Sequence, residues 1–144
     1  MAEDIHDNPT GWINRHIRNY VATDAANGHR YNGRDALLIT TRGCKTGQLR
    51  RTALFCGVDD DRYIVIGSDG GNPVHPGWYF NLLADPELEV QVGGDVFRCR
   101  ARTADGAEEV RLWDLMAAIF PLYHTYRGAT ERHIPVVVLE RIRG

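Results

Sequence analysis

The sequence contains very little lysine, serine and cysteine, and it has no long hydrophobic run. Lys45 is the only lysine, against 16 arginines, and Ser68 is the only serine. Three cysteines, Cys44, Cys56 and Cys99, are an odd number without close spacing, which is typical of free thiols in a reducing cytoplasm. No apolar run reaches the roughly 18 residues that a membrane-spanning helix needs, and the acidic start MAEDIHDNPT does not resemble a signal peptide. We therefore expect a cytoplasmic protein.

Charge and histidine spacing exclude two further classes. The chain has 17 basic and 19 acidic residues, a net charge of −2, whereas a nucleic-acid binder is usually strongly basic. Its six histidines are scattered, without an HExxH or CxxC motif, so we expect no metal site. The sequence shows no nucleophile with a suitably spaced base and no acid/base pair of carboxylates. It therefore gives no indication of hydrolytic chemistry.

The pattern of apolar residues predicts a single α+β domain that is mainly β. Amphipathic or helical patterns cover residues 11–27, 76–84 and 105–120, and strand patterns cover residues 35–42, 51–58, 62–68, 87–92, 95–103 and 134–142. Strands and helices do not alternate, which argues against a doubly wound parallel sheet. Six mostly antiparallel strands favour a closed or partly open barrel, because closure removes exposed edges. We expect residues 1–34 to pack on a barrel formed by residues 35–144.

A basic loop is the strongest local signal for ligand binding. Residues 42–51 (RGCKTGQLRR) carry four positive charges and no negative one. Gly43 and Gly47 permit tight turns whose amides can form an anion-binding nest. Lys45 and Arg50 can neutralise a phosphate or carboxylate, and Thr46 adds a hydroxyl. The spacing of these residues is not that of a Walker loop. The alternative interpretation is a solvated hairpin tip without a bound ligand.

Two other segments have both a structural and a functional interpretation. Residues 68–71 (SDGG) follow a strand, where a ligand can approach the main chain closely, but they also fit an ordinary glycine-rich loop. Phe120, Tyr123 and Tyr126 are spaced three apart and share one side of a helical or 3₁₀-like segment. They fit core packing, or a wall over a planar ligand with tyrosyl hydroxyls as donors.

Three segments in this order resemble one known family. They are GCKTGQLRRTAL, GSDGGNPVHPGWYFNLLADP and FPLYHTYRGATERHIPVVVLE, and together they span about residues 36–140. The chain resembles the deazaflavin-dependent nitroreductase family, whose coenzyme is F420 and whose fold is a split β-barrel of the FMN-binding type. The resemblance implies an oxidoreductase that passes hydride from reduced F420 to a quinone, a nitroaromatic or an activated alkene.

The same resemblance implies roles for individual residues. The loop with Cys44, Lys45, Thr46 and Arg50 would bind the phosphate and glutamate tail of the coenzyme. Tyr123, Tyr126 and Ser68 are the implied catalytic residues, with Tyr123 hydrogen-bonding the acceptor. The remaining residues implied to line the coenzyme site are Arg51, Thr52, Ala53, Leu54, Phe55, Ile66, Gly67, Asp69, Gly77, Trp78, Tyr79, Phe80 and Asn81.

Several alternatives stay open from the sequence. The same barrel could bind FMN, or the protein could bind the deazaflavin as a carrier without catalysis. The helix over residues 11–27 could lie on a membrane surface, although packing over the barrel is favoured because its polar face is not clearly basic. The expected partner is a small-molecule hydride acceptor and not a nucleic acid, in a monomer or a homodimer.

Overall fold

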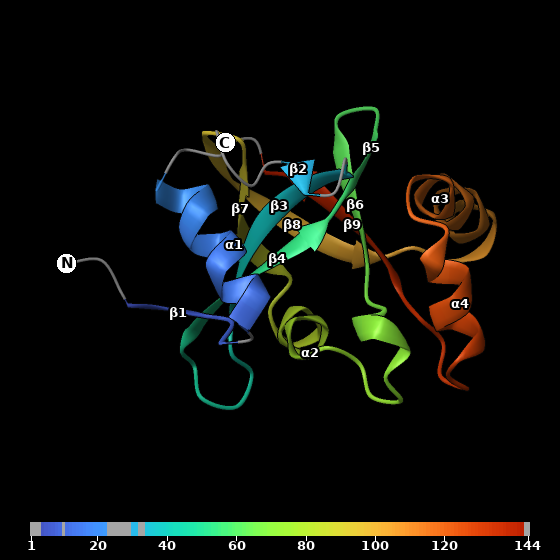
Figure 1. The fold of residues 1–144 in the computed structure, drawn as a ribbon, viewed down its shortest axis with the longest axis horizontal. Helices are drawn as coiled ribbons and strands as arrows, with labels where there is room; N and C mark the ends of the chain where they lie inside the picture. The colour runs from blue at the N-terminus through green and yellow to red at the C-terminus, as the bar shows by residue number, and fades with distance from the viewer. Residues whose placement is uncertain (1–3, 10, 23–29, 32–33, 143–144) are drawn as a thin grey trace.

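The computed structural model describes residues 4–9, 11–22, 30–31 and 34–142, and it is a curled sheet surrounded by helices (Figure 1). The strands are β1 (Ile5–Asp7), β2 (Arg30–Tyr31), β3 (Arg34–Arg42), β4 (Leu49–Phe55), β5 (Gly57–Asp59), β6 (Arg62–Ile66), β7 (Glu87–Val92), β8 (Asp95–Thr103) and β9 (Val136–Arg141). The helices are α1 (Gly11–Ala22), a 3₁₀ turn η1 (Asp69–Gly71), α2 (Gly77–Ala84), α3 (Gly106–Ile119) and α4 (Leu122–Gly128). The predicted continuation of the first helix over residues 23–27 lies outside the described residues.

The sheet is almost entirely antiparallel, as the sequence predicted, but it has more strands than expected. Within the described part of the chain, nine strands pair, and eight of them follow the order β1-β4-β3-β7-β8-β9-β6-β5. Among the pairs of these described strands, only β1–β4 is parallel. The prediction of six strands missed β1 and β2, which are too short to show a period of alternation, and it joined β4 and β5 into one strand.

The break between β4 and β5 explains how the sheet curls. Only Cys56 separates them, yet β4 pairs with β3 near one end of the strand order and β5 pairs with β6 at the other. The amide of Cys56 donates to the carbonyl of Asp35 at 3.1 Å, which holds the bend against β3. Both ends of the sheet therefore meet at this residue.

The central strands are apolar on both faces because the sheet is covered on both faces. Leu37 and Ile39 of β3 lie in the main core with residues of β6, β7, β8 and β9. Leu38, which points to the opposite face, packs with Ile17 and Tyr20 of α1. This double burial accounts for the uninterrupted apolar run of β3, which alternation alone would not predict.

The helices cover different parts of the sheet (Figure 1). Helix α1 lies against β4, α2 lies beside β3, and α3 and α4 pack together against the side formed by β5, β6 and β9. The Tyr20 hydroxyl donates to the carbonyl of Ala36 at 3.1 Å and accepts from the amide of Gly93 at 2.8 Å, which ties α1 to β3 and to the turn between β7 and β8. Among the described residues, no helix has the length and apolar character that crossing a membrane requires.

Candidate functional site

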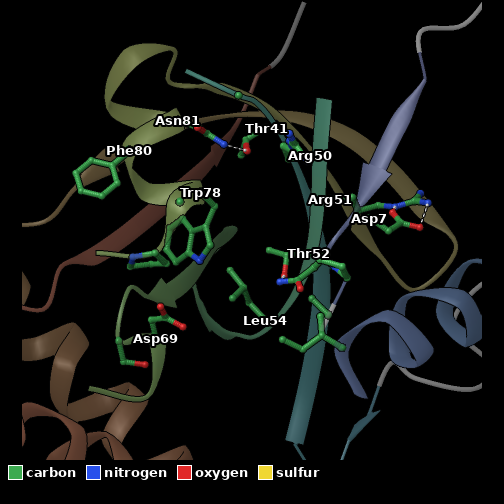
Figure 2. Close-up of a pocket in the computed structure, with 18 of the residues that line it drawn as sticks. Asp7, Thr41, Arg50, Arg51, Thr52, Leu54, Asp69, Trp78, Phe80 and Asn81 are labelled. Carbon is green, nitrogen blue, oxygen red and sulfur yellow. Dashed lines mark hydrogen bonds and ion pairs between the residues drawn. The ribbon is translucent and has the colours of Figure 1, made fainter. Parts of the chain in front are cut away.

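A large cavity opens between β4, the basic loop, α2 and α4. Its volume is about 1260 Å³. Every residue that the sequence predicted for the site lines this cavity except Gly67 and Tyr79. Figure 2 shows Trp78 of α2 on one side, facing Thr52 and Leu54 of β4 on the other. Three segments that lie far apart in the sequence are thus brought to one place.

The basic loop is held in shape by its own hydrogen bonds. The amide of Gly43 donates to the carbonyl of Gln48 at 2.7 Å, and the amide of Gly47 donates back to the carbonyl of Gly43 at 2.8 Å. Gly47 has a φ of +72°, which favours glycine. The amide of Cys44 is also used, so the predicted nest of inward amides is largely occupied by protein partners. The side chains of the loop are therefore its more available polar groups.

The charged side chains of the loop differ in how far they are already neutralised. Lys45 is exposed and, within the described part of the chain, makes no hydrogen bond or ion pair. Arg50 is exposed and donates to the side-chain oxygen of Gln48 at 3.0 Å. Arg51 instead forms a bidentate pair with Asp7, with N···O distances of 2.6 and 3.1 Å (Figure 2). Lys45 and Arg50 are thus the cations available to an anionic ligand.

Asn81 of α2 connects the basic loop to the sheet. Its side-chain oxygen accepts from the amide of Cys44 at 3.0 Å, and its side-chain nitrogen donates to Thr41 Oγ1 at 3.0 Å (Figure 2). Asn81 is only 7% exposed and Thr41 only 1%. The resemblance implied that Asn81 contacts the coenzyme, and that stays a prediction; in the structure Asn81 lines the cavity and its amide also links the basic loop to β3.

Of the five predicted site residues on α2, Trp78 and Tyr79 point in different directions. Trp78 is half-buried and lines the cavity, whereas the neighbouring Tyr79 points to the main core. The Tyr79 hydroxyl lies 2.9 Å from Thr103 Oγ1 on β8. Tyr79 therefore does not line the cavity, because successive side chains of a helix point about 100° apart and only one of these two can face it. Gly67 is turned away as well, packing against Pro135.

The single serine lies at the start of a loop with unusual backbone conformation. Ser68 is buried and lines the cavity together with Asp69 and Gly70. The φ angles of Asp69, Gly70 and Gly71 are +44°, +64° and +81°. Three left-handed residues in succession turn the chain sharply after β6 and present it to the cavity.

The tyrosines on α4 serve both the core and the cavity. Tyr123 is 5% exposed, packs with its ring centroid 4.9 Å from that of Phe120, and still lines the cavity. Tyr126 is half-buried and lines it too. Phe120 packs against Phe55 of β4 at 5.2 Å, which links the aromatic segment to the strand opposite α2. The core packing that the sequence suggested is present, and the role of these tyrosines over a planar ligand stays a prediction.

The sequence did not predict the contribution of the N-terminal segment to the cavity wall. The cavity residues outside the predictions are His6, Asp7, Asn8, Pro9, Ile13, Ala36, Thr41, Gly43, Gly70, Val74 and Pro76. Asn8 is fixed to β4 by its amide, which donates to the carbonyl of Arg51 at 2.8 Å, and by its side chain, which donates to Thr52 at 3.1 Å. No local signal marks this short strand, because only its pairing with β4 defines it.

Comparison with known proteins places these features in a family. Residues 12–141 match the family of F420H(2)-dependent quinone reductases. An F420H(2)-dependent quinone reductase of Mycobacterium tuberculosis is 37% identical over 143 residues, covering 90% of this chain and 96% of that protein. A second Mycobacterium tuberculosis protein of the same name is 33% identical over 103 residues, covering 72% of this chain and 87% of that protein.

Solved structures agree with this assignment. An F420-H2 dependent reductase (FDR-A) superposes with a TM-score of 0.67 at 38% identity, covering 73% of this chain and 93% of that chain. A structure described as a domain-swapped dimer superposes with a TM-score of 0.71 at 34% identity, covering 92% of this chain and 100% of that chain. A FAD-binding protein of Mesorhizobium loti, at 14% identity and a TM-score of 0.51, shares the fold alone. The chain therefore belongs to the F420H(2)-dependent quinone reductase family.

Proposed function

We propose that this protein reduces a quinone with hydride from reduced F420, and that the cavity beside β4 binds both molecules. The observation that carries the proposal is the division of this one cavity into two parts. Lys45 and Arg50 give one part of the lining positive charge that no acidic side chain of the described residues pairs with, and Trp78, Leu54 and Tyr123 give another part apolar and aromatic character. A ligand with a charged tail and a flat ring system matches that division.

The residues present fit the coenzyme in charge, shape and size. Its phosphate and glutamate tail needs cations, and Arg50 can bind an oxyanion through two parallel N–H groups. Its flat ring needs apolar walls, and Trp78 and Leu54 face each other across the space (Figure 2). Ligand pockets usually measure about 300–1,000 Å³, so a volume of about 1260 Å³ leaves space for an acceptor beside the coenzyme.

F420 in its reduced form supplies the hydride when bound. The protein then has to orient the two molecules, exclude water and stabilise the negative charge that develops on the acceptor oxygen. We assign charge stabilisation to the hydroxyl of Tyr123, with Tyr126 beside it. Ser68 and its main-chain neighbours form the wall that contacts the ring edge. Phe55 and Ile66 keep the centre of the cavity apolar, which strengthens each of these polar interactions.

We also propose how the chain is organised around this site. Residues 35–144 form a split β-barrel, to which β1 and β2 add short strands, and the meeting of β4 and β5 at Cys56 supports this closure. Residues 1–34 are an accessory segment that completes the cavity wall through Asp7 and Asn8. A relative described as a domain-swapped dimer supports association of this chain as a homodimer. Ile17 and Tyr20 on the apolar face of the first helix are fully buried against the sheet, which supports packing over the barrel, and liposome co-sedimentation with and without residues 1–27 tests the alternative of contact with a membrane surface.

The proposal is tested by titrating the purified protein with oxidised F420, FMN and NADPH while following tryptophan fluorescence, because Trp78 is in the cavity. We expect saturable quenching by F420, with FMN at least tenfold weaker. Consumption of reduced F420 in the presence of a water-soluble quinone then measures catalysis. Tighter binding of FMN would favour a flavin enzyme, and F420 binding without turnover of any quinone or nitroaromatic would favour a carrier. Either result contradicts the proposal.

A further inference from the structure

Arg132, in the segment between α4 and β9, contacts the loop that carries Ser68. Its Nε donates to the carbonyl of Asn72 at 2.7 Å, and its Nη2 donates to the carbonyl of Ser68 at 2.7 Å. Its Nη1 donates to the carbonyl of Gly67 at 3.0 Å and lies 3.0 Å from His75 Nδ1. One guanidinium group thus holds three carbonyls and one ring nitrogen across residues 67–75.

This loop is a wall of the cavity, and Arg132 lies outside the cavity behind it. Ser68, Asp69, Gly70 and Val74 line the cavity, whereas Arg132 does not. Gly70 and Gly71 adopt positive φ angles easily, but Asp69, with a φ of +44°, is a non-glycine residue in a sparsely populated backbone region, and such residues persist only when their surroundings hold them. The carbonyls that Arg132 binds lie on both sides of these residues, so it is placed to hold that conformation.

The contact with His75 makes the interaction between Arg132 and the loop sensitive to protonation of the His75 imidazole. Because a guanidinium group can only donate, Nδ1 must accept, and His75 must be neutral with its proton on Nε2. The imidazole ring lies between aromatic side chains of α2, with centroids 4.9 Å from Tyr79 and 5.6 Å from Phe80. On the other side are Arg132 and His133. No carboxylate within the described residues bonds to His75 to offset a positive charge.

The surroundings of His75 disfavour its protonated form. Burial, the charge of Arg132 and the charge of His133 all lower the pKa of His75 from its usual value. His133 is itself 2.9 Å from a carboxylate oxygen of Glu109. Asp69 is the acidic group that acts on the guanidinium group of Arg132. Protonation of His75 would replace an accepted hydrogen bond with two cations in contact.

We propose that Arg132 is a positioning residue for the coenzyme site, holding the Ser68–Asp69 wall in place, and that its bond to neutral His75 makes this hold pH-dependent. This inference rests on the proposed function, because it concerns the wall against which the coenzyme ring is placed. Arg132 acts through the loop and does not touch the ligand. A substitution that removes the several N–H donors of Arg132 but keeps its positive charge should therefore weaken coenzyme binding.

The first test compares Arg132→Lys with Arg127→Lys, a matched control on the neighbouring helix whose arginine lies over the ring of Trp113 and not on the loop. Lysine keeps the charge but cannot make several parallel bonds. For Arg132→Lys we expect the Kd for F420 to rise at least tenfold, and amide hydrogen exchange within residues 68–75 to accelerate at least tenfold. Amide hydrogen exchange in β3 and β7 of Arg132→Lys should stay within twofold of the wild-type rate. In Arg127→Lys, both the Kd for F420 and the exchange rate of residues 68–75 should stay within twofold of the wild-type values.

Uniformly faster exchange across the whole protein, or an unchanged Kd, would overturn the positioning role. Failure of the wild-type protein to bind F420 would instead overturn the proposed function, while loop exchange in the variant would still report whether Arg132 holds the loop. These two failures are therefore distinguishable.

The second test is the pH profile of His75→Asn, whose side-chain oxygen can accept from Arg132 but does not titrate. The ratio of the wild-type Kd to the variant Kd for F420 cancels any titration of the coenzyme. We expect this ratio to be constant above pH 7 and to rise at least threefold as the pH falls from about 6.5 to 5. A ratio that stays constant over the whole range would show that His75 does not control the loop.

Discussion

Replacing Asn81 with leucine should disconnect the basic loop from α2 while nearly preserving side-chain volume. The substitution removes the bond to the amide of Cys44 and the bond to Thr41 Oγ1, each 3.0 Å long. Losing a hydrogen bond that water can replace costs about 1 kcal/mol, and leaving a buried group without a partner costs about 1–3 kcal/mol. Thr41 is 1% exposed and bears that cost, whereas the amide of Cys44 lies in an exposed loop that water can reach.

We therefore expect Asn81→Leu to lower the free energy of unfolding by about 2–4 kcal/mol. For a domain of this size that corresponds to a fall in Tm of roughly 4–12 °C. Thermal unfolding followed by circular dichroism measures the change. The Kd for F420 should rise about tenfold, equivalent to about 1.4 kcal/mol, because the loop with Lys45 loses its anchor.

Thr41→Val separates stability from loop position. It removes the bond to Thr41 but leaves the bond between Asn81 and Cys44, so we expect lower stability with a Kd for F420 within threefold of the wild-type value. If Thr41→Val weakened F420 binding as much as Asn81→Leu, the anchor to Cys44 would not be what positions the loop. An unchanged Tm in Asn81→Leu would refute the energetic argument altogether.

Three further predictions follow from single groups. Tyr123→Phe should lower kcat/KM for quinone reduction roughly hundredfold, the loss typical of an oxyanion donor, with the Kd for F420 within twofold; unchanged kcat/KM for every acceptor would contradict the assigned role. At pH 8 the exposed Cys44 should react quickly with Ellman's reagent, while burial raises the pKa of Cys56 to about 12 and that of Cys99 to about 11 and protects both until guanidinium unfolds the chain; three fast thiols in the native protein would be inconsistent with this burial. Hydrogen bonds from two arginine side chains lower the pKa of Asp59 to about 2, so its stabilising effect is complete above about pH 4 and is lost as the pH falls towards 2; Asp59→Asn should flatten the pH dependence of urea unfolding in that range, and an unaltered slope would argue against the pair.

The sequence was sufficient to predict the elements whose hydrophobic pattern is continuous. The apolar runs of β3 and β9 and the alternation of β7 and β8 each identify a strand, because their side chains face a core on one or both sides. The basic loop was also visible, since charge density is a local property of the sequence. The hydrogen-bond partners of the loop amides were not predictable in the same way. The amide of Cys44, for example, donates to Asn81, which lies on a helix 37 residues further along the chain.

The features that were missed all depend on contacts between distant segments. Asp7 and Arg51 are 44 positions apart, and their pairing decides which arginines of the loop remain available to a ligand. Strand β1 has three residues and exists only through its register with β4. The bend at Cys56 is also a property of the closed sheet, because residues 51–58 taken alone resemble one uninterrupted strand.

Coenzyme binding in the proposed function requires that the basic loop bind the anionic tail of F420. The most direct measurement is the Kd for F420 in the double variant Lys45→Met/Arg50→Gln, set against Arg98→Gln/Arg100→Gln, which removes the same charge from exposed positions on β8. Two charged contacts of about 1.5–3 kcal/mol each predict a rise in Kd of at least a hundredfold, together with a weaker dependence on salt. The β8 variant should stay within threefold of the wild-type protein. Wild-type affinity and salt dependence in the loop variant would contradict the account.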